Sequence, residues 1–449
     1  MVSLPKQPPD PWPALTGLDP RTVAQAMRAA YREEEYLPWD KLRHKTPPEG
    51  LTVEQWWAVT KMSRLAQARD LPLVDQEGRP FNYVLSDALL RGLDDVTARA
   101  SGRVEMPELV VNERTRDRYL VSSLMEEAIT SSQLEGAVTT QRVAKEMLRT
   151  GRSPRSVSER MIANNYVAMQ FIREHVDDDI TPSMVSRVHA ILTEGTLDDP
   201  EAAGRLQLPG EVRVGVWSVS SDEPLHEPPP AEQLPTRLAA LCDFANGRTG
   251  TGWLHPILRA IVTHFMVGYD HYFVDGNGRT ARALFYWVAL KHGYWLLEFV
   301  AISRILRDAP AQYARAYLNT EQDDGDVTYF ALHHVAVIRR AIDELHQYLA
   351  RKGRDLRVAR EAVGGLGINH RQASIVEGVL RGSATRFTAA SHGASHDVVL
   401  ATARADLRQL EDLGLLSSRR EGRQQVWEPV AGFDQRLSEL SKSHTLTVD

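Results

Sequence analysis

Between residue 106 and about residue 345, apolar side chains recur at helical spacing in one segment after another. Such spacing predicts amphipathic helices that each bury one face. Start signals support this prediction: Thr181 can cap a helix, and Pro182 suits the first helical position. One segment differs, because residues 212–219 alternate with period two before a run of turn residues. We therefore predict a mainly α fold with one short β-hairpin or exposed edge strand.

Three regions are predicted along the chain. Residues 1–105 begin Pro-rich and continue as an N-terminal helical region, in which residues 75–80 interrupt an otherwise mainly helical stretch up to about residue 100. Residues 106–350 hold the long succession of helices. The basic stretch 351–354 follows a helix expected over about 327–349 and marks a boundary. Residues 355–449 then predict a small α/β unit.

Local signals place several helices more closely. Thr52, with Gln55 three residues later, has the pattern of a capping box. Further helices are expected over about 113–135, 156–175, 256–269 and 277–291, and others after Pro182 and Pro230. The glycine that follows the first of these, Gly136, can supply a left-handed cap.

Composition excludes several classes of protein. Hydrophobic residues make up 43% and charged residues 25% of the chain, as in ordinary globular proteins. The net charge of −6 argues against binding nucleic acid along the whole length. The only cysteine, Cys242, cannot form an intrachain disulfide, and no Cys/His cluster suggests zinc. We find neither a signal peptide nor a long apolar run, so we expect no membrane span and a cytoplasmic protein.

The segment from His271 to Arg282 reads HYFVDGNGRTAR and carries the strongest chemical signal. Gly276 and Gly278 permit unusual backbone angles and close approach by a ligand. The chain then enters a helix, whose first N–H groups and positive dipole end form an anion site. Asn277 lies between the two glycines, within this predicted anion site.

The charged residues of this segment suit a polyphosphate. Arg279 and Arg282 are three apart in the first turns of the helix, where their positive charge opposes the helix dipole. Their position makes sense if guanidinium groups pair with phosphate oxygens. Asp275 offers an oxygen ligand for Mg²⁺ between carboxylate and nucleotide. His271 has an ordinary pKa near 6.5 and is a candidate general base.

This segment resembles the Fic family signature, His-Pro-Phe-x-Asp/Glu-Gly-Asn-Gly-Arg-x-x-Arg, at every position except the proline, which is Tyr272 here. The resemblance extends over roughly residues 106–345 and implies a Fic-type helical core. It implies that His271 deprotonates a target hydroxyl and that Asp275 holds Mg²⁺. The remaining residues implied to contact the nucleotide are Gly276, Asn277 and Gly278 at the α- and β-phosphates, Arg279 at the β-phosphate and Arg282 at the γ-phosphate.

Two further elements resemble parts of that family. The predicted hairpin, with Val214, Gly215 and Val216 at its centre, looks like the flap that holds a target segment by strand addition. A simple edge strand is an equal alternative. Upstream, Ser131, Glu135 and Gly136 match the inhibitory motif Ser/Thr-x-x-x-Glu-Gly/Asn. By that resemblance, Glu135 pairs with Arg282, occupies the γ-phosphate site and restrains the enzyme.

The resemblance implies a protein adenylyltransferase that moves AMP from ATP to a Ser, Thr or Tyr hydroxyl of a protein target and of itself. Removal of AMP from the target, and a homodimer, are also implied for some relatives. Two alternatives stay open: the same fold using another phosphate-containing donor, and a DNA-binding regulator that uses the site as a nucleotide sensor.

The C-terminal unit resembles a winged helix, with residues 401–410 as its recognition helix. Leu407 and Leu410 are expected to face inward, and Arg404 and Arg408 outward. Three arginines are expected in the wing: Arg419, Arg420 and Arg423. DNA binding through the major groove and docking of a protein are both open, because acidic and basic residues nearly balance.

Overall fold

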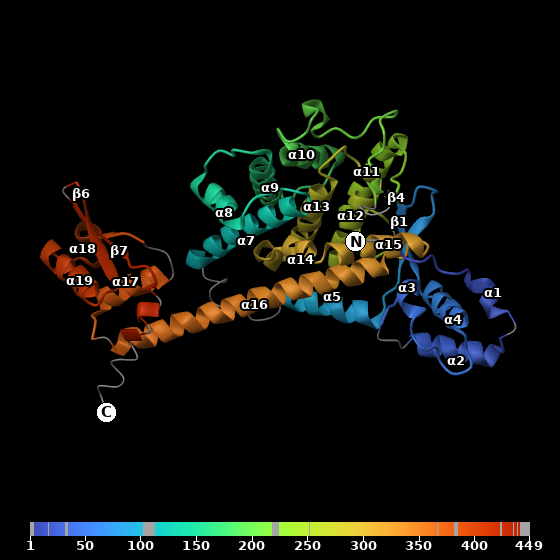
Figure 1. Ribbon diagram of the computed structural model, residues 1–449, viewed down its shortest axis with the longest axis horizontal. Helices are drawn as coiled ribbons and strands as arrows, with labels where there is room; N and C mark the ends of the chain where they lie inside the picture. Colours follow the sequence, from blue (N-terminus) through green and yellow to red (C-terminus); the bar gives the residue numbers. More distant parts are fainter. Residues whose placement is uncertain are drawn as a thin grey trace. The chain divides into compact units, whose positions relative to one another are not determined.

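The computed structural model describes residues 4–16, 18–31, 35–101, 113–217, 224–250, 252–365, 367–380, 385–422, 424–433, 435–437 and 439–440. The chain forms two compact units. The first comprises residues 1–105 and 118–344, and the second comprises residues 106–117 and 345–449. Figure 1 shows the helices that dominate the first unit and the small sheet of the second.

The N-terminal region consists of short helices around one hairpin. Thr52 and Gln55 form the predicted capping box, with both reciprocal hydrogen bonds present. The elements are α1 (Pro11–Leu15), α2 (Pro20–Tyr31), α3 (Trp39–Leu42), α4 (Val53–Leu65), β1 (Arg69–Val74), β2 (Pro80–Tyr83) and α5 (Asp87–Ala100).

The hairpin of β1 and β2 corrects the expectation that this stretch is helical outside residues 75–80. Its strands pair antiparallel, and Arg69 lies opposite Tyr83. The Asp75 side chain holds the turn, because it accepts hydrogen bonds from the N–H groups of Glu77 at 3.0 Å and Arg79 at 2.8 Å. An aspartate that binds the backbone two and four residues later favours a turn over a continuing helix.

The helical core of the first unit confirms the predicted helix-rich segment. Its helices are α7 (Glu113–Leu134), α8 (Gln141–Thr150), α9 (Val157–Glu174), α10 (Pro182–Thr193), α11 (Leu234–Ala245), α12 (Pro256–Asp270), α13 (Asn277–Lys291), α14 (Ile302–Asp308), α15 (Pro310–Gln322) and α16 (Thr328–Gly365). Residues 113–117 of α7 and 345–365 of α16 belong to the second unit. Helices α12 and α13 pack together at the centre, and nearly all of their residues are buried. In the turn between these two helices, Asp275 is exposed and His271 and Val274 are partly exposed, so a ligand can reach the turn from solvent.

Two expectations about this core need correction. The helix expected to end at about residue 349 continues to Gly365, so the predicted boundary at 351–354 lies inside α16. The stretch contains no proline, and arginine, alanine and leucine all favour a helix, so nothing stops it there. The strand expected from residue 212 begins only at Val216, where β3 (Val216–Trp217) pairs with β4 (Pro224–His226). Residues 218–223, which include most of the turn predicted at 220–224, lie outside the described residues.

Beyond the end of α16, the described residues of the second unit form the helices α17 to α19 and an antiparallel sheet of order β5-β7-β6. Its core includes Leu407, Leu410 and Trp427, all fully buried, while Arg404 and Arg408 are exposed as predicted. The unit's elements are α17 (His370–Leu380), β5 (Phe387–Thr388), α18 (Ala389–His396), α19 (Leu400–Asp412), β6 (Leu416–Glu421) and β7 (Gln424–Pro429). Arg423, expected in the wing, lies outside the described residues.

Among the helices in the described ranges, we find none that is both long and apolar enough to cross a bilayer.

Candidate active site

The site is built on the turn that joins α12 to α13. Gly276 caps α13 with φ of 79°, a left-handed conformation that favours glycine. The Asn277 side chain closes the turn, because it accepts from Phe273 N at 3.0 Å and donates to Phe273 O at 2.7 Å. A Cβ on Gly276 would lie 2.9 Å from Thr193 Cγ2. Both the backbone angle and the available space therefore require glycine at this position.

His189, which sequence reasoning missed, supports the turn from α10. Its Nε2 donates to Asp275 O at 2.8 Å, and its Nδ1 accepts from Gly204 N at 2.9 Å. Its ring stacks on Phe273 with centroids 3.7 Å apart. Burial lowers the pKa of His189 to about 4, so the ring is neutral and keeps this tautomer. A lone histidine on an apolar helix gives no sequence signal of this role.

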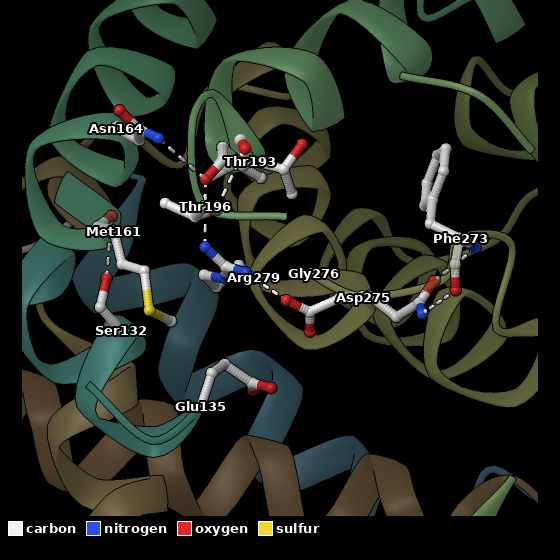
Figure 2. A network of polar contacts seen from close by, with 12 residues as sticks. Ser132, Glu135, Met161, Asn164, Thr193, Thr196, Phe273, Asp275, Gly276 and Arg279 are labelled. Carbon is white, nitrogen blue, oxygen red and sulfur yellow. Dashed lines mark hydrogen bonds and ion pairs between the residues drawn. The ribbon is translucent and has the colours of Figure 1, made fainter. Parts of the chain in front are cut away.

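Arg279 lies under the turn and is only 1% exposed. Its Nη1 donates to Leu192 O at 3.0 Å, and its Nη2 contacts Asp275 Oδ2 at 3.2 Å. Figure 2 shows the Asp275 carboxylate turned toward this guanidinium. Burial lowers the pKa of Arg279, and its Nε is buried without an acceptor. A buried donor of this kind is costly unless a ligand supplies the missing acceptor.

Arg282 faces the end of α7, which lies far away in sequence. Its Nε donates to Ser131 Oγ at 2.8 Å, and its Nη2 donates to Ser131 O at 3.1 Å and to Glu135 Oε1 at 2.9 Å. Burial disfavours the charge of Arg282, but the Glu135 carboxylate more than offsets this and raises its pKa. The ion pair expected between Glu135 and Arg282 is therefore present.

The Glu135 carboxylate also lies against the glycine turn. A Cβ on Gly278 would overlap Glu135 Oε1 and come within 2.7 Å of its Cδ. Gly136, with φ of 92°, turns the chain just after α7 and so aims Glu135 at α13. A negative group thus already occupies the anion site at the start of α13.

His271 ends α12 in a left-handed conformation, with φ of 45°. Its Nδ1 lies 2.6 Å from Gly268 O, which can only accept, so Nδ1 carries the proton and Nε2 has a free lone pair. Burial and the neighbouring His226 lower the pKa of His271 to about 4. The imidazole is therefore neutral at physiological pH and can act as a base.

Arg213, in the segment that precedes β3, binds the backbone around His271. Arg213 points inward and donates to Asp270 O at 2.6 Å and to His271 O at 3.0 Å. Val214 is 39% exposed, and Gly215 has no side chain. Val216 pairs through its backbone with His226 in β4. The alternation with period two predicted a strand here, but it did not predict that Arg213 points inward while Val212 is exposed.

Tyr272, the departure from the signature, joins a buried network. Its hydroxyl donates to Asp270 Oδ2 at 2.6 Å, and Arg237 Nε donates to Asp270 Oδ1 at 2.8 Å. Arg237 Nη1 also donates to Asp75 O at 3.0 Å, which ties the N-terminal hairpin to the turn between α12 and α13. Burial raises the pKa of Asp270, although both partners favour its ionised form. Tyr272 therefore supports the turn from its buried side.

Asp275 suits a magnesium ion that is shared with a nucleotide. Its side chain is 57% exposed, and only Oδ2 is engaged, by Arg279. Within the described ranges, no three His, Cys, Asp or Glu side chains gather as a ready-made metal site. One carboxylate completed by phosphate oxygens and water is the usual environment of Mg²⁺ in nucleotide sites.

Comparison with known proteins agrees with this geometry. The sequence profile of the Fic/DOC family matches residues 179–289, which include the turn and most of α13. The chain contains a Fic/DOC family domain. The protein adenylyltransferase Fic of Nematostella vectensis is 38% identical to it over 69 residues, which are 15% of this chain and 16% of that relative. The chain thus matches about a sixth of that relative's length.

A solved structure supports the fold. The crystal structure of a Fic family protein from Desulfovibrio desulfuricans superposes with a TM-score of 0.51 at 16% sequence identity. The alignment covers 78% of this chain and 98% of that one. The Fic-type fold, helical with small antiparallel sheets, is therefore shared beyond the Fic/DOC segment itself.

Proposed function

We propose that the protein is an adenylyltransferase, which transfers AMP from ATP to a hydroxyl group of a protein. The observation that carries this proposal is the convergence of Arg279, Arg282 and the N-terminus of α13 on the glycine turn that follows His271. Together these positive groups suit a ligand with several negative charges, such as a polyphosphate, better than a ligand with a single carboxylate. The distant relative that is named a protein adenylyltransferase supports the same class of donor.

In the proposed complex, the Gly276–Gly278 turn binds the α- and β-phosphates through its N–H groups. The unpartnered Nε of Arg279 supplies a donor to the β-phosphate. Arg282 binds the γ-phosphate once Glu135 has left it. Asp275 would hold Mg²⁺, which would neutralise charge on the phosphate oxygens.

The chemistry requires one base and one leaving group. His271 Nε2 accepts the proton of the target hydroxyl as its oxygen bonds to the α-phosphorus. The bond from that phosphorus to the bridging oxygen breaks, and pyrophosphate leaves with the electron pair. Arg279 stabilises the charge that develops on this leaving group, so positioning and electrostatics supply most of the rate enhancement.

The target segment is proposed to lie along residues 212–216. Arg213 faces the catalytic turn, so the neighbouring Val212 and Val214 face outward, and Val212 is 89% exposed. An extended peptide could pair with this strip and bring its hydroxyl to His271.

Glu135 is proposed as an inhibitor of the resting enzyme. Its carboxylate takes the anion site and engages Arg282, so a γ-phosphate must displace it. ATP bound without that displacement would hold its α-phosphate in an unproductive position. Whether Glu135 also serves removal of AMP from the target stays a prediction, as does a homodimer.

The decisive experiment uses Glu135→Gly protein with Mg²⁺ and ATP labelled at either the α- or the γ-phosphate. Label from the α-position alone on protein, with an AMP-sized mass increase, supports the proposal. Label from the γ-position would indicate a phosphotransferase instead. The matched control is Glu135→Gly combined with His271→Ala, which should stay unlabelled. ATP binding by every variant, with no adduct at all, would favour the nucleotide sensor.

For the C-terminal unit, we propose a winged helix that binds duplex DNA. Its second and third helices, α18 and α19, are joined by a three-residue connection, as in a helix-turn-helix. The exposed Arg404 and Arg408 lie one turn apart on the outward face of α19. Val399 and Leu400, 70% and 53% exposed, are the feature that favours a protein partner instead.

A further inference from the structure

We propose that His226, in β4, is a positioning residue that carries a positive charge at neutral pH and opposes protonation of His271. The proposal rests on the proposed role of His271 as the base. His226 is only 8% exposed and touches none of the groups assigned to the phosphates. The inference follows from the two hydrogen bonds of its ring and from its distance to His271.

Both ring nitrogens of His226 face groups that accept. Nδ1 lies 2.7 Å from Glu321 Oε2 in α15, and Nε2 lies 2.7 Å from Tyr269 O in α12. A carboxylate and a carbonyl oxygen offer no proton, so each nitrogen must donate and the ring is an imidazolium. Burial disfavours that charge, but the hydrogen bond and charge of Glu321 outweigh it and raise the pKa of His226.

His226 and His271 form hydrogen bonds with consecutive carbonyl groups in the last turn of α12. His271 Nδ1 binds Gly268 O, and His226 Nε2 binds Tyr269 O. The two ring centroids are 6.1 Å apart. A cation at that distance in a partly buried site opposes protonation of His271, by about one pKa unit or more. The same bonds fix β4 against α12.

The other charged groups around the two rings act in both directions. His271 faces the Arg213 guanidinium from the segment before β3 and the Glu135 carboxylate from the end of α7. His226 faces Glu321 and, at longer range, Asp270, which is paired with Arg237. Loss of His226 alone would leave Glu321 as an uncompensated anion near His271. The charge pair, and not burial alone, is thus expected to set the pKa of His271.

The test is a titration of histidine side-chain resonances by NMR, with His271 assigned through His271→Ala. Removing His226 with His226→Gln should raise the pKa of His271 by about one unit. Neutralising both partners, with His226→Gln and Glu321→Gln, should reverse part of this rise. The control His44→Gln, at an exposed histidine outside the site, should change nothing. An unchanged His271 titration in folded His226→Gln protein would overturn the proposal.

A second measurement needs no variant of His226. In the wild type at neutral pH, both ring nitrogens of His226 should carry protons, and Glu321→Gln should lower its pKa. A neutral His226 in the wild type would equally overturn the inference. These NMR results do not depend on AMP transfer, so they stand even if the Glu135→Gly enzyme transfers nothing and the proposed function fails.

Catalysis gives a third readout on the Glu135→Gly background. His226→Gln should move the acid limb of the kcat profile to higher pH by the same shift as the pKa of His271. The KM for ATP should stay unchanged, because His226 touches no phosphate group. A merely structural role would lower activity equally at all pH values.

Discussion

Glu135 Oε1 lies 2.9 Å from Arg282 Nη2, although the two residues are separated by 147 positions in the chain. The same carboxylate lies against Gly278, so one side chain contacts both an arginine and the glycine turn. Its charge also reaches His271 and Arg279. Release of Glu135 should therefore change nucleotide binding and catalysis together.

We predict that Glu135→Gly increases ATP-dependent self-labelling by roughly tenfold or more, because each 1.4 kcal/mol of competition removed is worth a factor of ten. Initial rates with α-labelled ATP would measure it. Glu135→Gln, which keeps the size but not the charge, should give an intermediate rate. Equal rates for wild type and Glu135→Gly would rule out the inhibitory role.

The same variant should be less stable without ligand. Removing Glu135 leaves a buried donor of Arg282 unsatisfied, at a cost of about 1–3 kcal/mol. ATP with Mg²⁺ should restore the loss, so the ligand-induced rise in Tm should be larger for Glu135→Gly than for wild type. Thermal unfolding with and without nucleotide tests this; a smaller rise in the variant would contradict the shared site.

His271→Ala, made in the Glu135→Gly protein, should lower AMP transfer by about 10²–10⁴-fold, the usual contribution of a general base. Calorimetric titration should find ATP affinity nearly unchanged, because the side chain of His271 forms its hydrogen bond with Gly268 O and not with the glycine turn. Loss of both binding and transfer would instead assign His271 a structural role.

Local signals were enough to predict the central part of this molecule. Gly276 and the apolar run after it predicted α13 at its observed bounds, Asn277–Lys291. Pro256 marked the start of α12. These signals succeed because caps and breakers act within a few residues. The end of α16 was predicted too early, because no helix-breaking residue near residue 349 marks an end there and the helix continues to Gly365.

The supporting residues of the site could not be predicted in this way. His189 meets Asp275 across 86 positions and His226 meets Glu321 across 95, so only tertiary packing brings each pair together. Arg213 binds backbone carbonyl groups, which every residue has, so the sequence gives no sign of its partners. The signature therefore pointed to the groups expected to contact ligand, while the groups that orient them emerge only from the fold.

His189 should make stability depend on pH. Its pKa is about 4 in the folded protein against an ordinary 6.5, so the unfolded chain binds more protons between these values. Its contribution, up to ~3 kcal/mol, is present above pH 6.5 and is lost as pH falls through 4. The stability difference between wild type and His189→Gln, from urea unfolding, should shrink over that interval. A constant difference would contradict the neutral, buried ring.

The C-terminal unit offers a separate test. If Arg404 and Arg408 contact phosphates, the double change to alanine should weaken binding to duplex DNA of any sequence and reduce the salt slope, log Kd against log salt, by about two. Arg436→Ala is the matched control, because Arg436 is also exposed but pairs with Glu439 outside α19. Gel shifts over a salt series would measure both variants. If wild-type protein binds no duplex, the exposed Val399 and Leu400 become the better guide, and α19 is then expected to dock a protein through an apolar contact that salt does not weaken.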